Sequence, residues 1–225
     1  MSAGRSRTSR RRDVYARRQL GAIAARWDAR ADSWDQSLQN PDCCLNEDDA
    51  YRRYTRLVQR LLGRRRPFCA RHGVIDAGCG TGLVLAGVIS AFAWGIGLDL
   101  SPRMIRAARA KHIVKTRFLL GDCFHLAASC PPAGAVLSRG VLLSHYGRRQ
   151  GARLLRAARA ALAPGGFLVF DFLNEAARTH YRHAPENKTW YTGQEIQAMA
   201  RRAGFSTATI LGRPRRRALL LLAET

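Results

Sequence analysis

Three glycines spaced two residues apart, Gly78, Gly80 and Gly82, are the part of this sequence best suited to holding a ligand. They follow a short apolar run, Gly73–Ala77, that we expect to be a strand, and they precede an expected helix. Because glycine has no Cβ atom, the backbone here can approach a ligand closely and offer N–H groups at the helix start. A dinucleotide fingerprint would have its third glycine one position later, where this chain has Leu83. The shorter spacing therefore favours a polar group smaller than a pyrophosphate.

Asp99 supplies a second chemical signal. It directly follows the next expected strand, Trp94–Leu98. An acidic residue at this place can accept hydrogen bonds from the two hydroxyls of a ribose. The glycine spacing and Asp99 together therefore indicate a site for a ligand that contains a nucleoside.

The surrounding sequence indicates which elements position these residues. Short apolar runs alternate with segments of helical periodicity, which is typical of a parallel sheet with helices on both faces. The expected strands are Gly73–Ala77, Trp94–Leu98, Arg117–Leu120, Ala135–Ser138 and Phe167–Phe172. The expected helices between them are Thr81–Phe92, Pro102–His112 and Arg148–Leu162.

The C-terminal part departs from this alternation. Thr192 and Glu195 have the spacing of a capping box, which predicts a helix that ends near Ala203–Gly204. Two apolar runs, Phe205–Leu211 and Ala218–Ala223, follow on either side of a turn, and this pattern predicts an antiparallel hairpin. We therefore expect an α/β fold with a seven-stranded, mostly parallel sheet that ends in this hairpin.

Composition limits the class of protein. The 225 residues, 47% of them apolar, suffice for one buried core. We expect a domain at 67–225, a helical segment at 21–66 and a basic tail at 1–20. The net charge of +22 would attract nucleic acid or a membrane surface. However, only three of the 38 basic residues are lysines, and a GC-rich coding sequence produces the same arginine bias.

The sequence shows neither a secretory signal nor a membrane span. Seven of the first eighteen residues are arginine and no apolar stretch follows them, while the longest uncharged stretch, Gly82–Leu98, is short and carries four glycines. We therefore expect a cytoplasmic protein, with organellar import by the arginine-rich N-terminus as the alternative. The six cysteines lack zinc-ligand spacing, so we expect reduced thiols and no metal site.

The stretch Val74–Gly166 resembles class I S-adenosylmethionine-dependent methyltransferases, in particular the small bacterial enzymes typified by ubiquinone and menaquinone methyltransferases. The matching segments, in that family's order and spacing, are "VIDAGCGTG", "GIGLDLSPRMIRAARAK", "RFLLGDCFHL", "AVLSRGVLLSH" and "ALAPGGFLVFDF". The segment "YTGQEIQAMARRAGF" resembles the helix that leads into the family's final hairpin. The resemblance implies a Rossmann-like fold, S-adenosylmethionine as cofactor and methyl transfer, but it does not specify the acceptor.

The resemblance also implies a set of cofactor contacts. Asp76 and the three glycines would surround the methionine part, and Asp99 would hold the ribose. Asp122 and the backbone of Cys123 would meet the adenine amino group, and Ser138–Arg139 would lie beside the sulfonium. The full set is Asp76, Gly78, Gly80, Gly82, Asp99, Asp122, Cys123, Ser138 and Arg139.

Methyl transfer needs in-line approach of a nucleophile more than it needs an acid or a base. A base would help if the acceptor is a phenol, an amine or an enol. Candidates follow the fourth and fifth strands, at the sheet edge where open α/β folds bind ligands. We expect His145 to be catalytic, and Asp171 to point into the mouth of the cleft and contact the substrate. The further candidates are Tyr146, His180, Tyr181 and His183, of which Tyr146 and Tyr181 are expected substrate or lid residues.

Trp27 and Trp34 are seven residues apart, so on a continuous helix they would share a face. In the resembling family an aromatic residue followed by Asp commonly forms a lid over the cofactor, and Trp34-Asp35 matches that pattern. The alternative is that the two tryptophans pack a helix onto the core.

Three functions fit these observations. The first is methyl transfer to a small molecule. The second is methyl transfer to RNA, which the basic segments "RSRTSRRR" and "GRPRRR" favour and the lack of interleaved aromatic residues disfavours. The third is a non-catalytic subunit that binds the cofactor and supports a partner protein.

Overall fold

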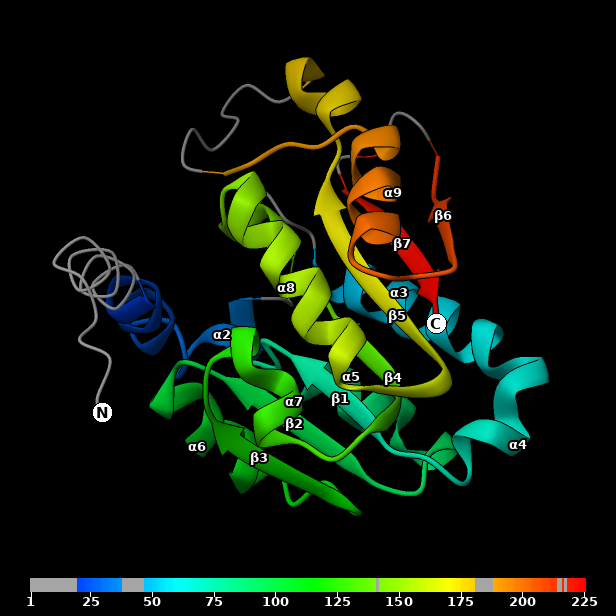
Figure 1. Cartoon of the computed structure of the whole chain (residues 1–225). Coiled ribbons are helices and arrows are strands. Elements are labelled where there is room, and N and C mark those ends of the chain that lie inside the picture. The colour runs from blue at the N-terminus through cyan, green and yellow to red at the C-terminus, as the bar shows by residue number, and fades with distance from the viewer. Residues whose placement is uncertain (1–19, 38–46, 141, 181–187, 214–215, 217) are drawn as a thin grey trace, which may run out of the picture.

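Seven strands form one sheet in the order β3-β2-β1-β4-β5-β7-β6 (Figure 1). This computed structural model describes residues 20–37, 47–140, 142–180, 188–213, 216 and 218–225. The strands are β1 (Val74–Ala77), β2 (Gly95–Asp99), β3 (Thr116–Leu120), β4 (Ala133–Ser138), β5 (Leu162–Leu173), β6 (Thr207–Leu211) and β7 (Ala218–Glu224). The first five are parallel, whereas β7 is antiparallel to both β5 and β6. The predicted fold class, including the C-terminal hairpin, is confirmed.

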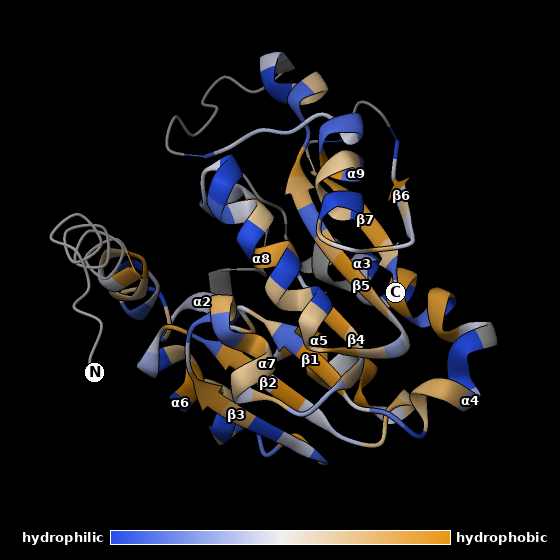
Figure 2. Cartoon of the chain, viewed as in Figure 1, coloured by the Kyte–Doolittle hydropathy of each residue, from blue (hydrophilic) through white to orange (hydrophobic). Residues whose placement is uncertain are grey.

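Successive strand residues alternate between two cores, as the period of two in a strand requires. In β5, Phe167 and Val169 join one buried cluster, whereas Leu168 and Phe170 join the other. Helices α3 (Glu47–Leu62), α5 (Leu83–Val88) and α6 (Pro102–Ala110) supply side chains to the first cluster. Helices α7 (Leu126–Ser129), α8 (Arg148–Ala160) and α9 (Gly193–Arg202) supply them to the second. Figure 2 shows the result, with apolar strands enclosed by helices whose outer sides are hydrophilic.

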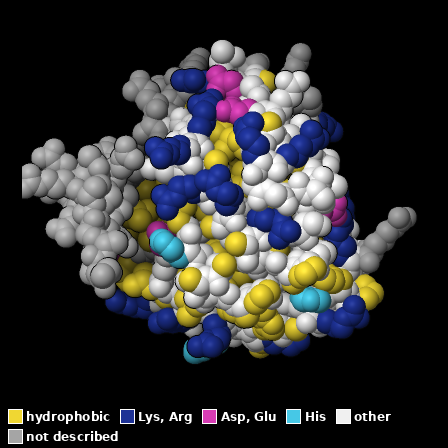
Figure 3. Space-filling model, in the orientation of Figure 1, with side chains coloured by type: hydrophobic (Ala, Val, Ile, Leu, Met, Phe, Trp, Pro, Cys, Tyr) yellow, Lys and Arg dark blue, Asp and Glu magenta, His cyan; other side chains and the backbone are white. Residues whose placement is uncertain are grey.

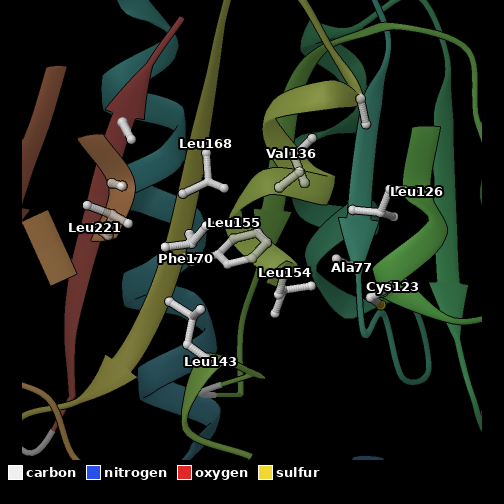
Figure 4. Close-up of a cluster of buried hydrophobic side chains, with 14 of the residues drawn as sticks. Ala77, Cys123, Leu126, Val136, Leu143, Leu154, Leu155, Leu168, Phe170 and Leu221 are labelled. Carbon is white, nitrogen blue, oxygen red and sulfur yellow. The ribbon is translucent and has the colours of Figure 1, made fainter. Parts of the chain in front are cut away.

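The core on the α8 side is formed by side chains from several elements (Figure 4). Leu154 and Leu155 of α8 are fully buried and lie against Val136 of β4 and Phe170 of β5. Burial of each such side chain contributes about 1.5–3 kcal/mol. This packing fixes the carboxyl ends of β4 and β5, from which the predicted catalytic residues extend.

Several helices are shorter than expected, for local reasons. The predicted helix Thr81–Phe92 begins only at Leu83, because Gly82 has a φ of 84° and cannot belong to a right-handed helix. A 3₁₀ turn, η2 (Ile89–Ala91), replaces its last turn. The predicted capping box at Thr192 is half formed. Thr192 Oγ1 accepts from the Glu195 amide at 3.1 Å, but the Glu195 carboxylate pairs with Arg148 instead.

The predicted N-terminal segment 21–66 divides into two different parts. In α3 the side chains of Tyr54, Val58 and Leu62 are buried against α5 and the sheet, so α3 belongs to the core. The part around residues 20–37 lies at the edge of the fold (Figure 1), where Leu20 and Ile23 pack against the other buried cluster. The expected tail at 1–20 lies outside the described residues except for Leu20.

Arginine and lysine side chains are spread widely over the surface. Figure 3 shows them across the face that α8 and α9 cover, with few acidic side chains among them. Within the described ranges, no helix is both long and apolar enough to cross a membrane.

We expect Gly97→Ala to lower the free energy of unfolding by about 1–3 kcal/mol, because cores tolerate added atoms poorly. An added Cβ at Gly97 would lie 2.6 Å from the buried Phe118 ring and 2.8 Å from Cys79 Sγ in the glycine loop. Chemical denaturation measures the change. Gly63→Ala is the matched control, because nothing lies within 4 Å of its added Cβ. Equal stability of the two variants would contradict the tight packing of β2.

Candidate functional site

In the glycine loop between β1 and α5, three positions have no side chain and a left-handed backbone conformation, as the sequence predicts. Gly78, Gly80 and Gly82 have φ values of 72°, 51° and 84°. Such angles are strained for any residue with a Cβ atom. The amides of Gly78 and Cys79 donate to the Leu98 carbonyl at 2.8 and 3.1 Å, which fixes the loop against the end of β2. The exposed edge of the loop thus presents backbone without side chains.

Asp99 joins this loop to the start of α6. One carboxylate oxygen accepts from the Gly80 amide and the other from the Ser101 amide, each at 2.9 Å. Burial is the main cause that raises the pKa of Asp99 above its ordinary value. A carboxylate has about four lone-pair sites. The two oxygens therefore retain acceptor capacity for two ligand hydroxyls.

Asp76, at the end of β1, is 1% exposed, and neither carboxylate oxygen has a hydrogen-bond partner among the residues that the structure describes. Burial, with a smaller contribution from the charge of Asp99, raises the pKa of Asp76 to about 8. A buried polar group without a partner costs about 1–3 kcal/mol or more. A buried carboxylate of this kind, beside a loop whose backbone angles are left-handed, is expected in a site that binds a cationic group of a ligand.

The predicted adenine contacts lie next to one another in a short turn, η3 (Cys123–His125). Asp122 caps this turn, because its Oδ1 accepts from the Phe124 amide at 2.9 Å. Burial raises the pKa of the Cys123 thiol, and it also raises that of Cys79 in the glycine loop. Both thiols are therefore protonated and unreactive, which suits a packing role.

The predicted sulfonium neighbours make contacts within the protein. Ser138 Oγ donates to the Ala77 carbonyl at 2.8 Å and so ties β4 to β1. Arg139 forms an ion pair with Asp171 at 2.8 Å, and both side chains are almost fully buried. The Asp171 carboxylate also accepts from the Gly140 amide at 3.2 Å. Asp171 thus pairs with Arg139 and holds the turn after β4, and its predicted contact with the substrate stays a prediction.

His145 ends the turn η4 (Leu142–His145) beside the N-terminal segment. Its Nε2 lies 3.2 Å from the Gly140 carbonyl, and Nδ1 contacts the Lys188 ammonium. Burial, followed by the charges of Lys188 and Arg26, lowers the pKa of His145 to about 3. The imidazole is therefore neutral near pH 7, and the catalytic role of His145 stays a prediction.

Of the remaining tyrosine and histidine candidates, only Tyr146 has a described side chain. Tyr146 is 4% exposed and its ring lies 4.9 Å from that of Phe124, so it packs in the core, and its role toward a substrate stays a prediction. Tyr181, His183 and the side chain of His180 lie outside the described part of the chain.

Trp27 and Trp34 do not share one helix. The helix at residues 20–28 ends in a turn, and Trp34 begins α2 (Trp34–Ser37). Asp28, at this helix end, accepts from Ser101 Oγ and the Arg103 amide, which directs the chain across α6. The two indole rings nevertheless meet edge to face, with centroids 5.3 Å apart.

Three aspartates fasten this segment, residues 20–37, to the body of the protein. Asp28 binds the start of α6, as described above, and Asp32 pairs with Arg103. Asp35 accepts from Thr81 Oγ1 in the glycine loop at 2.6 Å and pairs with Lys111. The segment is therefore attached at the loop that is expected to hold the cofactor.

Sequence reasoning missed several residues of this site. The Tyr54 hydroxyl donates to the Val169 carbonyl at 2.7 Å, and the charges of Asp171 and Asp76 act on it from nearby. Lys188 contacts His145, and no sequence pattern marks either Tyr54 or Lys188. Asp28, Asp32 and Asp35 are also residues of this kind, because the helix ends at Asp28 and helical spacing therefore does not place the three on one face.

Comparison with known proteins supports the resemblance to methyltransferases that the sequence motifs indicate. Residues 74–166 match the family described as a methyltransferase domain. The ubiquinone biosynthesis O-methyltransferase of Thiobacillus denitrificans is 25% identical over 171 residues, which cover 68% of this chain and 72% of that protein.

Solved structures share the fold. Magnesium protoporphyrin IX methyltransferase from Synechocystis PCC 6803, with bound S-adenosylhomocysteine, has a TM-score of 0.71 at 16% identity and covers 91% of this chain and 98% of its own. An amino pentose methyltransferase from Micromonospora echinaspora, with bound S-adenosylmethionine, has a TM-score of 0.63 at 19% identity and covers 78% and 92%. The matched domain, the topology and the glycine loop all agree, and together they support a class I S-adenosylmethionine-dependent methyltransferase.

Proposed function

We propose that this enzyme methylates an oxygen, nitrogen or carbon nucleophile of a small molecule, and that the segment 20–37 closes over the bound cofactor. The observation that carries the proposal is the buried, unpartnered carboxylate of Asp76 beside the left-handed glycine loop. This carboxylate supports a site in which Asp76 gains a partner only when a cationic group of a ligand is bound.

The described residues fit S-adenosylmethionine part by part. Asp76 would face the amino group of the methionine part, and the glycine loop leaves room for that part to approach. Asp99 would accept from the ribose hydroxyls with the lone pairs that Gly80 and Ser101 leave unused. Asp122 and the backbone of Cys123 would meet the adenine. When bound, the cofactor supplies an electrophilic methyl group on a positively charged sulfur.

The protein's own residues would act by positioning the acceptor. His145 is too weak a base near pH 7, and Asp171 is engaged by Arg139 and Gly140. Asp171 instead holds the Gly140 turn, whose carbonyl in turn accepts from His145 Nε2. Correct positioning alone can lower a barrier by several kcal/mol, up to roughly 7–11.

Two observations favour a small acceptor. The segment 20–37 is attached to the glycine loop and α6, so it would restrict access by a large polymer. The names of the related proteins above refer to small molecules, namely ubiquinone, magnesium protoporphyrin IX and an amino pentose. RNA remains the second candidate because of the net charge of +22.

We expect Asp76→Asn to weaken S-adenosylmethionine binding by about tenfold or more, because it removes a buried charge opposite a cation. Since the pKa of Asp76 is about 8 in the free protein, wild-type affinity should rise from about pH 6 to pH 8 as the carboxyl loses its proton, and then level off. The variant should lack this rise. Calorimetric titration across pH measures both effects.

Thermal unfolding is the control for this variant. The pKa of Asp76 is raised in the folded state, so its contribution to stability is present at low pH and is lost as pH rises from about 4 to about 8. Asp76→Asn should therefore be at least as stable as the wild type at pH 8. A variant that unfolds more easily there, with unchanged affinity, would show that Asp76 has only a structural role.

We expect Asp35→Asn to weaken cofactor binding by about fivefold, because it weakens one hydrogen bond and one ion pair at the glycine loop. Trypsin should then cleave more rapidly after Arg26 and Arg30. Asp32→Asn is the matched control, since its partnership with Arg103 is largely exposed and contributes little. Identical affinity and cleavage in the two variants would argue against closure of this segment over the cofactor.

The acceptor class is tested with methyl-labelled S-adenosylmethionine, offered with a dialysable metabolite extract and, separately, with purified RNA. We expect label in the metabolite reaction only. Label in RNA alone, with a steep dependence on salt, would replace this proposal by the RNA alternative. Cofactor binding without transfer to either would favour the non-catalytic subunit.

A further inference from the structure

A pocket of about 480 Å³ lies between the end of α6 and the strand β3. β3 is the outermost strand of the sheet on this side, and α6 packs beside it (Figure 1). All of the lining belongs to the stretch 109–119, which contains none of the predicted cofactor or catalytic residues. Ligand pockets commonly have volumes of about 300–1,000 Å³. The pocket therefore has the size of a site for a small molecule.

The charged and titratable groups that line this pocket, Arg109, His112 and Arg117, are all basic. Nε and Nη2 of Arg109 donate to the Phe118 carbonyl at 3.2 and 2.7 Å, so this guanidinium is held in place and keeps further N–H donors for a ligand. Neither His112 nor Arg117 forms an ion pair within the part of the chain that the structure describes. The stretch 100–121 contains no Asp or Glu. The pocket therefore attracts an anion.

Apolar side chains complete the pocket wall. Ile113, Phe118 and Leu119 line it together with the basic residues. Val114 and Leu120, which bracket β3 in the sequence, are 71% and 58% exposed. Pockets for organic ligands typically combine such apolar walls with a few polar groups that fix the orientation of the ligand. The lining thus suits an anionic group attached to a small apolar body better than it suits a bare inorganic ion.

Two residues of this wall also touch the glycine loop. A Cβ atom at Gly82 would lie 2.8 Å from Phe118 Cζ and 3.1 Å from Ile113 Cδ1, so both side chains pack directly on this glycine. Gly82 is the residue from which α5 begins. Because protein interiors are close-packed and transmit strain, a ligand that fixes Phe118 and Ile113 also restricts the loop.

We propose that this pocket binds a small organic acid, either a carboxylate or a phosphate monoester with an apolar body, and that its binding raises the affinity for the cofactor. The inference goes beyond the proposed methyl transfer, but its second part rests on the proposed placement of the cofactor at the glycine loop. Arg109 and Arg117 pair with the anion, and the apolar body packs against Ile113 and Phe118. A loop that is already restricted loses less freedom when the cofactor binds, so the two binding events favour each other.

The anion site is tested by calorimetry on the full chain without cofactor, at constant ionic strength. Benzoate and phenyl phosphate are the anionic probes, which distinguish a carboxylate from a phosphoryl preference, and benzyl alcohol is the neutral probe. We expect at least one of the two anions to bind at least tenfold more tightly than benzyl alcohol, because the anion gains charge-assisted hydrogen bonds. Equal or tighter binding of benzyl alcohol would overturn the proposal.

Variants separate this pocket from general attraction to a basic protein. Arg117→Gln should weaken binding of the preferred anion by about tenfold, and Arg117→Lys, which keeps the charge, should weaken it less. The matched control is Arg156→Gln, which removes the same charge from an exposed position of α8 on the other face of the sheet and should change affinity less than twofold. An equal loss in the control would show that only the net charge attracts the anion. Thermal unfolding of each variant excludes misfolding as the cause.

The coupling is tested by titrating S-adenosylhomocysteine with and without a saturating concentration of the preferred anion. We expect the anion to raise the affinity for S-adenosylhomocysteine by about fivefold, and S-adenosylhomocysteine to raise the affinity for the anion by the same factor. Ile113→Ala should retain most of the anion binding but reduce this factor, because it removes a contact with Gly82. Val114→Ala is the matched control, because the Val114 side chain is largely exposed, and it should leave the factor unchanged.

The outcomes separate the parts of the inference. Anion binding that leaves the affinity for S-adenosylhomocysteine unchanged would overturn the coupling. An equal effect of Ile113→Ala and Val114→Ala would overturn its route through the contact with Gly82. If the anion binds but S-adenosylhomocysteine does not, the proposed cofactor site fails and the anion pocket stands.

Discussion

The carboxylate of Asp99 is the interaction on which the site depends. It accepts from Gly80 in the glycine loop and from Ser101 at the start of α6, so it sets the distance between the two segments that approach the cofactor. Ser101 in turn donates to Asp28, and Thr81, next to Gly80, donates to Asp35. The N-terminal segment is therefore positioned by the same few residues that shape the loop.

Burial of Asp76 costs free energy that a bound ligand can recover. Its buried carboxylate has no hydrogen-bond partner within the described ranges and its pKa is raised, so Asp76 carries a desolvation cost of the kind that stable cores avoid. The surrounding strands can tolerate this cost because both faces of the sheet are tightly packed. A ligand that brings a cationic group to Asp76 regains that free energy on binding. Local instability at a functional position is thus compensated by the regular packing elsewhere.

His145 and Asp171 lie at the carboxyl edge of the sheet, where the resemblance places them. Arg139 pairs with Asp171, and burial together with the charge of Lys188 lowers the pKa of His145. Both act on the Gly140 turn, Asp171 through its amide and His145 through its carbonyl. These contacts fix the turn that follows β4, and the catalytic roles of the two residues stay predictions.

The sequence alone determined the seven strands, their mainly parallel order, the final hairpin and the glycine loop. These features follow from residue periodicity and from the backbone freedom of glycine, which act over a few neighbouring positions. Only the tertiary structure decided which polar groups meet. Asp35 and Thr81 are 46 residues apart, Lys188 and His145 are 43 apart, and Tyr54 and Val169 are 115 apart. No local pattern encodes such pairs, because a side chain finds its partner only after the sheet and its helices have packed, and that packing also sets the burial that shifts each pKa.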